Sequence, residues 1–290
     1  MSQKIRKVII PVAGWGTRFL PATKAQPKEM LPIVDTPIIQ HVVEEAVASG
    51  IEEIILVTGA SKRAVEDHFD YNYALEQHLE KQNKPELLAE TRRIAEMATF
   101  VYVRQKGPYG NGTPVLTARD LIGDEPFAVM WGDEFFHSDY KPHLRQLIDV
   151  YEKYEQPVLT GYEVSSRDVE KYGIIDASLI EDGIFQVKRI VEKPKREEAP
   201  SNLASLGGYI LTPDIFDILA NLPLGKGGEL WLTDAIAKLL EKRPIYACLV
   251  NGTYYDTGSK FGYLQANIDT ALRRDDLRDD LLAYLKTKIK

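Results

Sequence analysis

The sequence predicts an α/β fold with a doubly wound, mainly parallel sheet and helices on both faces. Short apolar runs at residues 8–12, 54–57, 100–103 and 127–130 are typical of buried parallel strands. Residues 38–49, between the first two runs, carry apolar side chains at helical spacing and are followed by Gly50. Because strands and helices alternate, right-handed crossovers would cover both faces of the sheet, as in Rossmann-like folds.

Two regions depart from this alternation. Residues 71–98 are helical in pattern but interrupted by Pro85, which predicts a helical insert. Residues 158–212 contain short strands separated by turn residues, which predicts a small mixed β region, and residues 193–202 are expected to form an exposed loop. We expect one domain over residues 1–270, with halves at about 1–135 and 136–258, and a helical tail at 259–290.

Composition excludes several classes of protein. The 290 residues include 36 Lys and Arg and 43 Asp and Glu, which gives a net charge of −7 and argues against nucleic-acid binding through phosphates. A single cysteine, Cys248, excludes an intrachain disulfide and a multi-cysteine metal site, and it fits a reducing compartment, so we expect a cytoplasmic protein. No apolar run is long enough to predict a membrane span.

A glycine-rich loop follows the first predicted strand. Gly14 and Gly16 would let backbone N–H groups approach a phosphate, although such a pair can also mark a tight turn. Phe19 stands where the dinucleotide-binding fingerprint needs a third glycine, which counts against a nicotinamide oxidoreductase, and no Gly-Lys-Ser/Thr of a P-loop follows. Three prolines within the next dozen residues forbid a regular helix, so the loop presents Arg18 and Lys28 in an extended, shaped segment suited to a polyphosphate.

This loop resembles the nucleotide signature of the sugar-phosphate nucleotidyltransferases. The shared pattern is G-x-G-T-R-x-x-P-x-T followed by P-K-E-M-L-P, at residues 14–32. Within that family the chain is most similar to bacterial UTP–glucose-1-phosphate uridylyltransferases, and the resemblance covers about residues 5–270. It implies an enzyme that transfers a uridylyl group from UTP to glucose 1-phosphate with Mg²⁺, releasing pyrophosphate and giving UDP-glucose.

The sequence Gly-Asp-Glu occurs twice, and its two copies are expected at opposite edges of the sheet. Asp124 precedes the predicted strand at 127–130 and is expected with Glu125 in a turn. Asp133 follows that strand, at the carboxyl edge where open α/β sheets bind ligands. Next to a triphosphate, a carboxylate there would need a divalent cation, so Asp133 is a candidate Mg²⁺ ligand. Asp256 could cap the helix that follows it, but its Y-D-T-G-S-K context resembles the family's second metal ligand.

The resemblance assigns roles to further residues. For the nucleotide these are Ala13, Gly14, Gly16, Thr17, Glu29, Gln105 and Gly110, with Gln105 at the uracil edge. For the sugar phosphate these are Gly173, Glu192 and Lys193, in Y-G and V-E-K-P elements that match the family's. Arg18, Lys28 and Lys193 would stabilise charge during the reaction, and Asp133 and Asp256 would hold Mg²⁺.

The chain also departs from the family's pattern at several positions. Thr113 and Pro114 replace a common His-Ala pair, Gly208 replaces a basic residue, and Trp231 replaces a glutamine. These positions concern the base and the sugar more than the phosphates. Enzymes that use dTTP or another sugar 1-phosphate, and a non-catalytic nucleotide-sugar sensor, therefore stay open as alternatives.

The tail carries apolar residues at helical spacing. Phe261, Leu264, Ile268 and Leu272 would share one helix face, and Leu277, Leu281 and Leu285 would continue a similar stripe. Four aspartates between residues 275 and 280 would be repelled by anionic lipid, so we expect no membrane contact. The stripe could pack on its own domain or on a second subunit, and the resemblance to oligomeric uridylyltransferases favours a subunit contact, in a dimer or tetramer.

Overall fold

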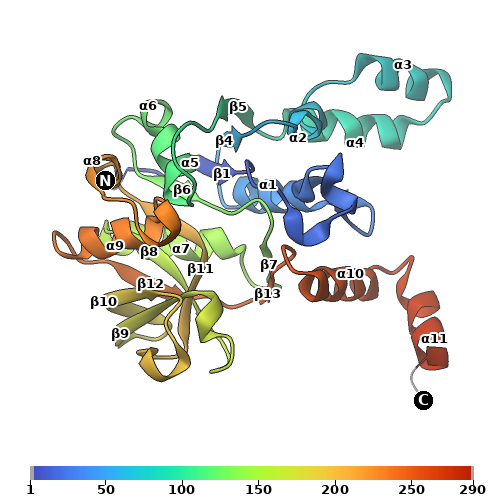
Figure 1. Ribbon diagram of the computed structural model, residues 1–290. Helices are drawn as coiled ribbons and strands as arrows, with labels where there is room; N and C mark the ends of the chain where they lie inside the picture. The colour runs from blue at the N-terminus through green and yellow to red at the C-terminus, as the bar shows by residue number, and fades with distance from the viewer. Residues whose placement is uncertain (1–2, 289–290) are drawn as a thin grey trace.

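The computed structural model describes residues 3–288, and Figure 1 shows its elements in order. The strands are β1 (Lys7–Pro11), β2 (Pro32–Ile33), β3 (Thr36–Pro37), β4 (Glu53–Thr58), β5 (Thr99–Arg104), β6 (Phe127–Val129), β7 (Phe135–His137), β8 (Val158–Glu163), β9 (Gly173–Glu181), β10 (Ile184–Glu192), β11 (Leu203–Leu211), β12 (Tyr246–Leu249) and β13 (Thr253–Tyr255). The α-helices are α1 (Ile38–Ala48), α2 (Arg63–His68), α3 (Tyr73–Lys81), α4 (Pro85–Glu96), α5 (Gly112–Thr117), α6 (Arg119–Ile122), α7 (His143–Tyr154), α8 (Asp214–Asn221), α9 (Leu232–Leu240), α10 (Lys260–Arg273) and α11 (Arg278–Lys288).

Nine strands form one mixed sheet, in the order β5-β4-β1-β6-β11-β8-β12-β10-β9. The first four strands in this order are parallel to one another. β11 then runs antiparallel to both β6 and β8, β12 is parallel to β8, and β10 is antiparallel to β12 and β9. The start of β9 also pairs with the start of β11. Parallel order therefore belongs to the N-terminal half, and the second half is mixed.

Side chains of β1 alternate between two hydrophobic cores. Val8 and Ile10 pack with residues of α1 and α7 on one face of the sheet. Ile9 packs with residues of α5, α8 and α9 on the other face. Because both faces of the strand are fully buried, helices must cover both faces of the sheet. This arrangement confirms the predicted α/β class with helices on both sides.

The predicted strands at 8–12, 54–57, 100–103 and 127–130 correspond to β1, β4, β5 and β6, and the predicted helix at 38–49 to α1. The helical insert consists of α3 and α4, with Pro85 as the first residue of α4, and projects from one end of the molecule (Figure 1). The mixed β region is not a separate sheet, because β11 pairs with β6 and so joins the second half to the parallel strands.

The tail consists of α10 and α11, which extend away from the sheet (Figure 1). The predicted stripe at Leu277, Leu281 and Leu285 is only half-buried, whereas Phe261 and Leu264 of α10 are 72% and 56% exposed. The exposed stripe therefore lies on α10 rather than on α11. Residues 289–290 of the predicted tail lie outside the described residues. None of the helices within residues 3–288 has the length and apolar character to cross a membrane.

Candidate functional site

The glycine-rich loop after β1 folds back on itself through three short 3₁₀ turns. Gly16 adopts a left-handed conformation with φ of 66°, and its carbonyl accepts a hydrogen bond from Thr23 Oγ1 at 2.7 Å. A Cβ on Gly14 would lie 3.4 Å from Lys28 Cε, and one on Gly16 would lie 3.1 Å from Lys28 Cβ. A side chain at position 16 would therefore crowd Lys28, whereas one at position 14 would meet it only in ordinary van der Waals contact.

Lys28 joins the loop to the end of β6. Its Nζ lies 2.5 Å from Oδ2 of Asp133, and both side chains are about one-fifth exposed. Burial alone would lower the pKa of Lys28, but the negative charges of Asp133 and Glu29 raise it above its ordinary value. Lys28 is therefore held as a cation at the carboxyl edge of the sheet.

A short ladder between β7 and β13 brings Asp256 next to Asp133. β7 begins two residues after Asp133, β13 ends just before Asp256, and Phe135 pairs with Tyr255 in antiparallel register. A Cβ on Gly258 would lie 2.7 Å from Asp133 Oδ2 and 3.1 Å from Asp256 Oδ1, so both carboxylates face the same point.

Asp133 and Asp256 repel each other, and the neighbouring cations offset this repulsion only in part. Burial raises the pKa of Asp256, the nearby Arg18 lowers it, and Asp133 raises it again. Arg18 Nη2 lies 3.3 Å from the same point beside Gly258. Both cations predicted from the loop, Arg18 and Lys28, thus face the two predicted metal ligands.

Glu29 follows Lys28 in the chain, and its side chain is fully buried. Its Oε2 pairs with Nζ of Lys62 at 2.7 Å, and its Oε1 has no hydrogen-bond partner within residues 3–288. Burial raises the pKa of Glu29, although Lys62 and Lys28 counteract this. An unsatisfied buried oxygen of this kind is costly unless a ligand or water supplies a donor.

The predicted sugar-phosphate residues gather where β9 begins and β10 ends. Gly173 pairs with Glu192 across the ladder, and a Cβ on Gly173 would lie 3.3 Å from Glu192 Oε2. That oxygen accepts a hydrogen bond from Thr233 Oγ1 at 2.8 Å. The carboxylate of Glu192 is therefore held in place beside the backbone of Gly173.

Lys193 leaves this ladder in an unusual backbone conformation. Its φ is 44°, in the left-handed region, and its N–H donates to the carbonyl of Tyr172 at 3.0 Å. Its Nζ lies 4.8 Å above the Trp231 ring, a cation–π geometry. Trp231, which departs from the family's pattern, thus supports the side chain of Lys193.

Two cavities meet at Asp133. The loop cavity, of about 350 Å³, is lined by residues of the glycine-rich loop together with Gln105 and Gly110. The strand cavity, of about 340 Å³, is lined by Gly173, Glu192 and other residues of the β9–β10 end. Asn111, Trp131 and Asp133 line both cavities. A group bound in one cavity would therefore reach a group bound in the other at Asp133.

The structure brings most of the predicted site residues to these cavities. The loop cavity contains Ala13, Gly14, Lys28, Glu29, Gln105, Gly110 and Asp133. The strand cavity contains Arg18, Asp133, Gly173, Glu192, Lys193 and Asp256. Gly16 and Thr17 line neither cavity. Gly16 adopts the left-handed conformation that turns the loop, and Thr17 is exposed.

The glycines after Gln105 allow two segments of backbone to approach each other closely, and Gly110, a predicted nucleotide contact, also lines the loop cavity. A Cβ on Gly110 would lie 2.2 Å from the carbonyl oxygen of Leu230, and φ of Gly110 is 122°. Gly112 donates its N–H to the same oxygen at 2.9 Å. These glycines let the loop pack against the backbone of Leu230.

The first copy of Gly-Asp-Glu lies in a turn, as predicted, and the glutamate of the second copy was not among the predicted site residues. Within that turn Glu125 pairs with Arg6 at 2.6 Å and Lys7 at 2.9 Å, which lowers its pKa to about 2, so it also ties the start of β1 to β6. Glu134, adjacent to Asp133, accepts a hydrogen bond from Tyr254 at 2.5 Å, and burial raises its pKa to about 8. Glu134 belongs to the second Gly-Asp-Glu motif, which was the sequence signal from which it could have been predicted.

Two exposed aromatic residues also line the loop cavity. Trp15 and Tyr109 are 67% and 66% exposed. Trp15 lies between the two glycines of the loop, and no residue pattern marked it or Tyr109 as part of a site. Their place in the site depends on how the loop after β1 meets the loop after β5, which no local sequence pattern specifies.

The donor set at Asp133 and Asp256 fits a divalent cation that also binds a ligand. Within residues 3–288, no group of three or more His, Cys, Asp or Glu side chains could hold a metal ion alone. Mg²⁺ commonly uses one or two carboxylates together with phosphate oxygens and water. Two converging carboxylates next to two cations match that requirement and would not form a closed structural site.

Comparisons with known proteins agree with this geometry. Residues 7–272 match the family model described as nucleotidyl transferase. The chain is 50% identical over 290 residues to the UTP–glucose-1-phosphate uridylyltransferase YngB of Bacillus subtilis (strain 168), covering all of this chain and 97% of that protein. It is 49% identical to a UTP–glucose-1-phosphate uridylyltransferase of Staphylococcus epidermidis, with 98% of each covered.

Solved structures show the same fold. A UDP-glucose pyrophosphorylase complexed with UDP-glucose superposes with a TM-score of 0.86 at 45% identity, covering 93% of this chain and all of the other. A UTP-bound enzyme of the same name from Acinetobacter baumannii superposes with a TM-score of 0.91 at 40% identity, covering 99% of this chain and all of the other.

The contact between Gly110 and Leu230 leads to a prediction about stability. Gly110→Ala adds a methyl group against a backbone carbonyl at a φ that alanine rarely adopts, whereas Gly123, with φ of 65°, has nothing within 4 Å. We expect Gly123→Ala to lower the free energy of unfolding by about 1–2 kcal/mol, and Gly110→Ala by at least twice as much. Urea unfolding followed by circular dichroism measures both. Equal losses would show that Leu230 yields to the added methyl group.

Proposed function

The chain belongs to the nucleotidyl transferase family, and on this premise we propose that it is a UTP–glucose-1-phosphate uridylyltransferase. The reaction would join UTP and glucose 1-phosphate to give UDP-glucose and pyrophosphate. The observation that supports this most directly is the meeting of the two cavities at Asp133, with Lys28 in the loop cavity and with Arg18 and Lys193 in the strand cavity.

The chemistry requires no nucleophile from the protein. A phosphate oxygen of glucose 1-phosphate attacks the α-phosphorus of UTP, and the bond between that phosphorus and the bridging oxygen of the β-phosphate breaks. Pyrophosphate leaves with the electron pair of the broken bond. A phosphate monoester has a second pKa of about 6, so the attacking oxygen carries no proton that a base must remove near neutral pH. Catalysis then rests on position and charge.

The loop cavity suits the nucleotide. Lys28 and Arg18 would neutralise the triphosphate, and Gln105 could offer both a donor and an acceptor to the edge of the base. The unsatisfied Oε1 of Glu29 could accept a hydrogen bond from a bound group. Trp15 and Tyr109 are placed to cover the nucleotide from the solvent side.

Asp133 and Asp256 would hold Mg²⁺, which supplies positive charge to the reacting phosphates when bound. On the acceptor side, Glu192 would accept hydrogen bonds from sugar hydroxyls, next to the backbone of Gly173. Lys193 would hold the sugar phosphate against the repulsion of the triphosphate. Its support by Trp231 places that charge at the edge of the strand cavity.

The proposal is tested by measuring pyrophosphate release with different substrates. UTP and dTTP are each combined with glucose 1-phosphate and other sugar 1-phosphates, with Mg²⁺ and with excess chelator. Highest turnover efficiency for UTP with glucose 1-phosphate supports the proposal. Preference for dTTP or for another sugar would replace it with a related transferase, and nucleotide binding without release would indicate a sensor.

The two Gly-Asp-Glu copies provide a matched pair of variants. Asp133→Asn removes a charge from the point where the cavities meet, and we expect a loss of activity of at least a hundredfold. Asp124→Asn makes the same chemical change on an exposed residue at the opposite edge of the sheet and should retain activity within twofold. Pyrophosphate release measures both, and circular dichroism checks the fold. Comparable losses in the two variants would contradict this location of the site.

Lys193 should affect the acceptor more than the nucleotide. A charge-assisted contact contributes about 1.5–3 kcal/mol, so Lys193→Ala should lower kcat/KM for glucose 1-phosphate at least tenfold. Binding of UTP, measured by calorimetry, should stay within twofold. Lys195→Ala, two residues further along the same exposed loop, is the control and should change neither quantity. A collapse of UTP affinity with normal acceptor kinetics would reverse the assignment.

We further propose that the enzyme is a homo-oligomer that covers the apolar face of α10. Phe261, Leu264 and Ile268 recur at helical spacing and are 72%, 56% and 40% exposed. A continuous apolar face of this kind is typical of a surface that binds another protein. Because α10 and α11 extend away from the sheet (Figure 1), a second copy can reach this face.

Charge on the face of α10 should reduce the assembly. The double substitution of Phe261→Asp and Leu264→Asp places two carboxylates on the proposed interface and should give a monomer in light scattering at micromolar concentration. Leu179→Asp with Ile180→Asp, also an exposed apolar pair, is the control and should leave the mass unchanged. A wild-type protein that is already monomeric would contradict the proposal.

A further inference from the structure

β11 contains a bulge in the wall of the strand cavity. Leu206 pairs with Thr160 and Tyr209 pairs with Leu159, so Gly207 and Gly208 are extra residues in the strand. Just before the bulge, Ser205 pairs with Gly173. The bulge therefore continues the wall that begins at the sugar-phosphate residues.

The front of the bulge is tightly packed. A Cβ on Gly207 would lie 1.8 Å from Glu134 Oε1 and 2.3 Å from Trp131 Cδ1. Gly207, Glu134 and Trp131 all line the strand cavity. Because no space separates these groups, a small shift of the bulge would move the wall of the cavity.

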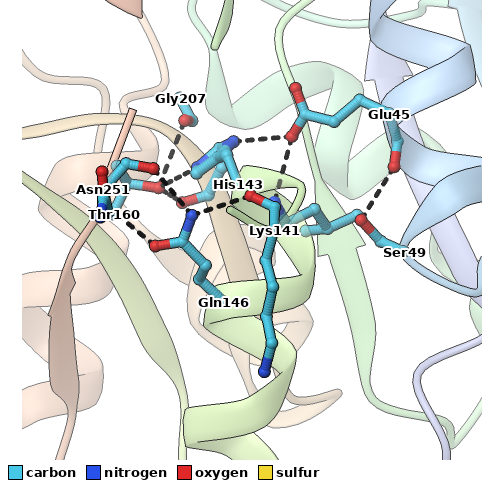
Figure 2. Close-up of polar contacts among 10 residues, drawn as sticks. Glu45, Ser49, Lys141, His143, Gln146, Thr160, Gly207 and Asn251 are labelled. Carbon is cyan, nitrogen blue, oxygen red and sulfur yellow. Dashed lines mark hydrogen bonds and ion pairs between the residues drawn. The ribbon is translucent and has the colours of Figure 1, made fainter. Parts of the chain in front are cut away.

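A buried polar network holds the bulge from behind (Figure 2). Thr160 Oγ1 donates to the carbonyl of Gly208 at 2.7 Å and also lies 3.3 Å from that of Gly207. Thr160 Oγ1 also lies 2.6 Å from Nε2 of His143, so a hydrogen bond joins the two side chains. The side chains of Thr160 and His143 therefore act as one unit.

The far end of the network is anchored in the first half of the chain. His143 Nδ1 lies 3.0 Å from Oε1 of Glu45 on α1, and this oxygen also accepts the N–H of Leu144 at 3.1 Å. Thr160 is fully buried and His143 is 2% exposed. Neither residue lines the strand cavity or the loop cavity, so any effect on a substrate is indirect, and the bulge is the part of the strand-cavity wall that Thr160 contacts.

His143 also accounts for the glycine at position 208. φ of Gly208 is 110°, and a Cβ there would lie 2.2 Å from His143 Cε1. The imidazole thus occupies the space into which any side chain at position 208 would project. With this backbone conformation, a side chain at position 208 and the imidazole of His143 could not both be present.

We propose that His143 and Thr160 are positioning residues for the acceptor, which fix the β11 bulge and so set the fit of the sugar 1-phosphate in the strand cavity. This inference rests on the proposed function, since it takes the strand cavity as the sugar-phosphate site. The pair contributes to the KM for the acceptor and leaves the nucleotide site unaffected.

The test uses Thr160→Val, which keeps the shape of the side chain and removes its hydroxyl. We expect the KM for glucose 1-phosphate to rise five- to twentyfold, with kcat within threefold and the Kd for UTP within twofold. Thr160→Ser restores the hydroxyl and should restore the KM. Thr212→Val is the matched control, because Thr212 is a buried threonine whose hydroxyl bonds at the other end of β11. It should lower the melting temperature without a rise in KM.

A double-mutant cycle examines His143. His143→Leu should raise the acceptor KM as Thr160→Val does, and the double variant should be no worse than either single variant, because both act through one bulge. A lower melting temperature with an unchanged acceptor KM in Thr160→Val would show a purely structural role and overturn the proposal. Equal losses of acceptor and UTP binding would also overturn it. If the wild-type protein releases no pyrophosphate with any sugar 1-phosphate, the proposed function is wrong and the positioning role fails with it.

Discussion

The contact between Lys28 and Asp133 is the interaction on which the rest of the site depends. It joins the glycine-rich loop to the end of β6 and lies where the two cavities meet. Removing either partner would leave a poorly solvated charge, which is costly in a partly buried site. The conformation of the loop supports this contact, because Gly16 has a left-handed φ and a Cβ there would crowd the side chain of Lys28.

The topology of the sheet explains why this contact forms where it does. β1 pairs with β4 on one side and with β6 on the other, so the strand order reverses between β1 and β6. Such a reversal leaves a crevice at the carboxyl ends of the two strands. The glycine-rich loop leaves β1 at that crevice and Asp133 follows β6 there. The antiparallel β7–β13 ladder then adds Asp256 from the far end of the chain. The charged side chains of the site gather there because the loop after β1, the end of β6 and the end of β13 all meet at this crevice.

Local sequence patterns could predict the parallel half of the sheet but not the connections between distant segments. Apolar periodicity located β1, β4, β5, β6 and α1 because each is a local feature of the chain. The pairing of Phe135 with Tyr255 joins residues 120 positions apart, and nothing in either segment specifies the other. From spacing alone, Asp256 could equally cap α10, and only the resemblance favoured a metal ligand. Glu134 was within a recognised motif, whereas Trp15 needed knowledge of how the loops meet.

The departures from the family pattern share a physical property. Each lies beside a charged or backbone group of the site, and at Gly208 the family's basic side chain is itself missing. Trp231 offers its ring to Lys193, and Thr113 donates its hydroxyl to the carbonyl of Pro108 in the loop above it. Gly208 yields its space to His143. The residues at the proposed phosphate site pair with one another's charges, so no neighbouring residue can compensate for the loss of one of them. The supporting residues are constrained by shape and hydrogen bonding, and a change in one of them can be compensated by a neighbour. Differences in base or sugar preference can therefore arise at these positions without loss of the phosphate chemistry.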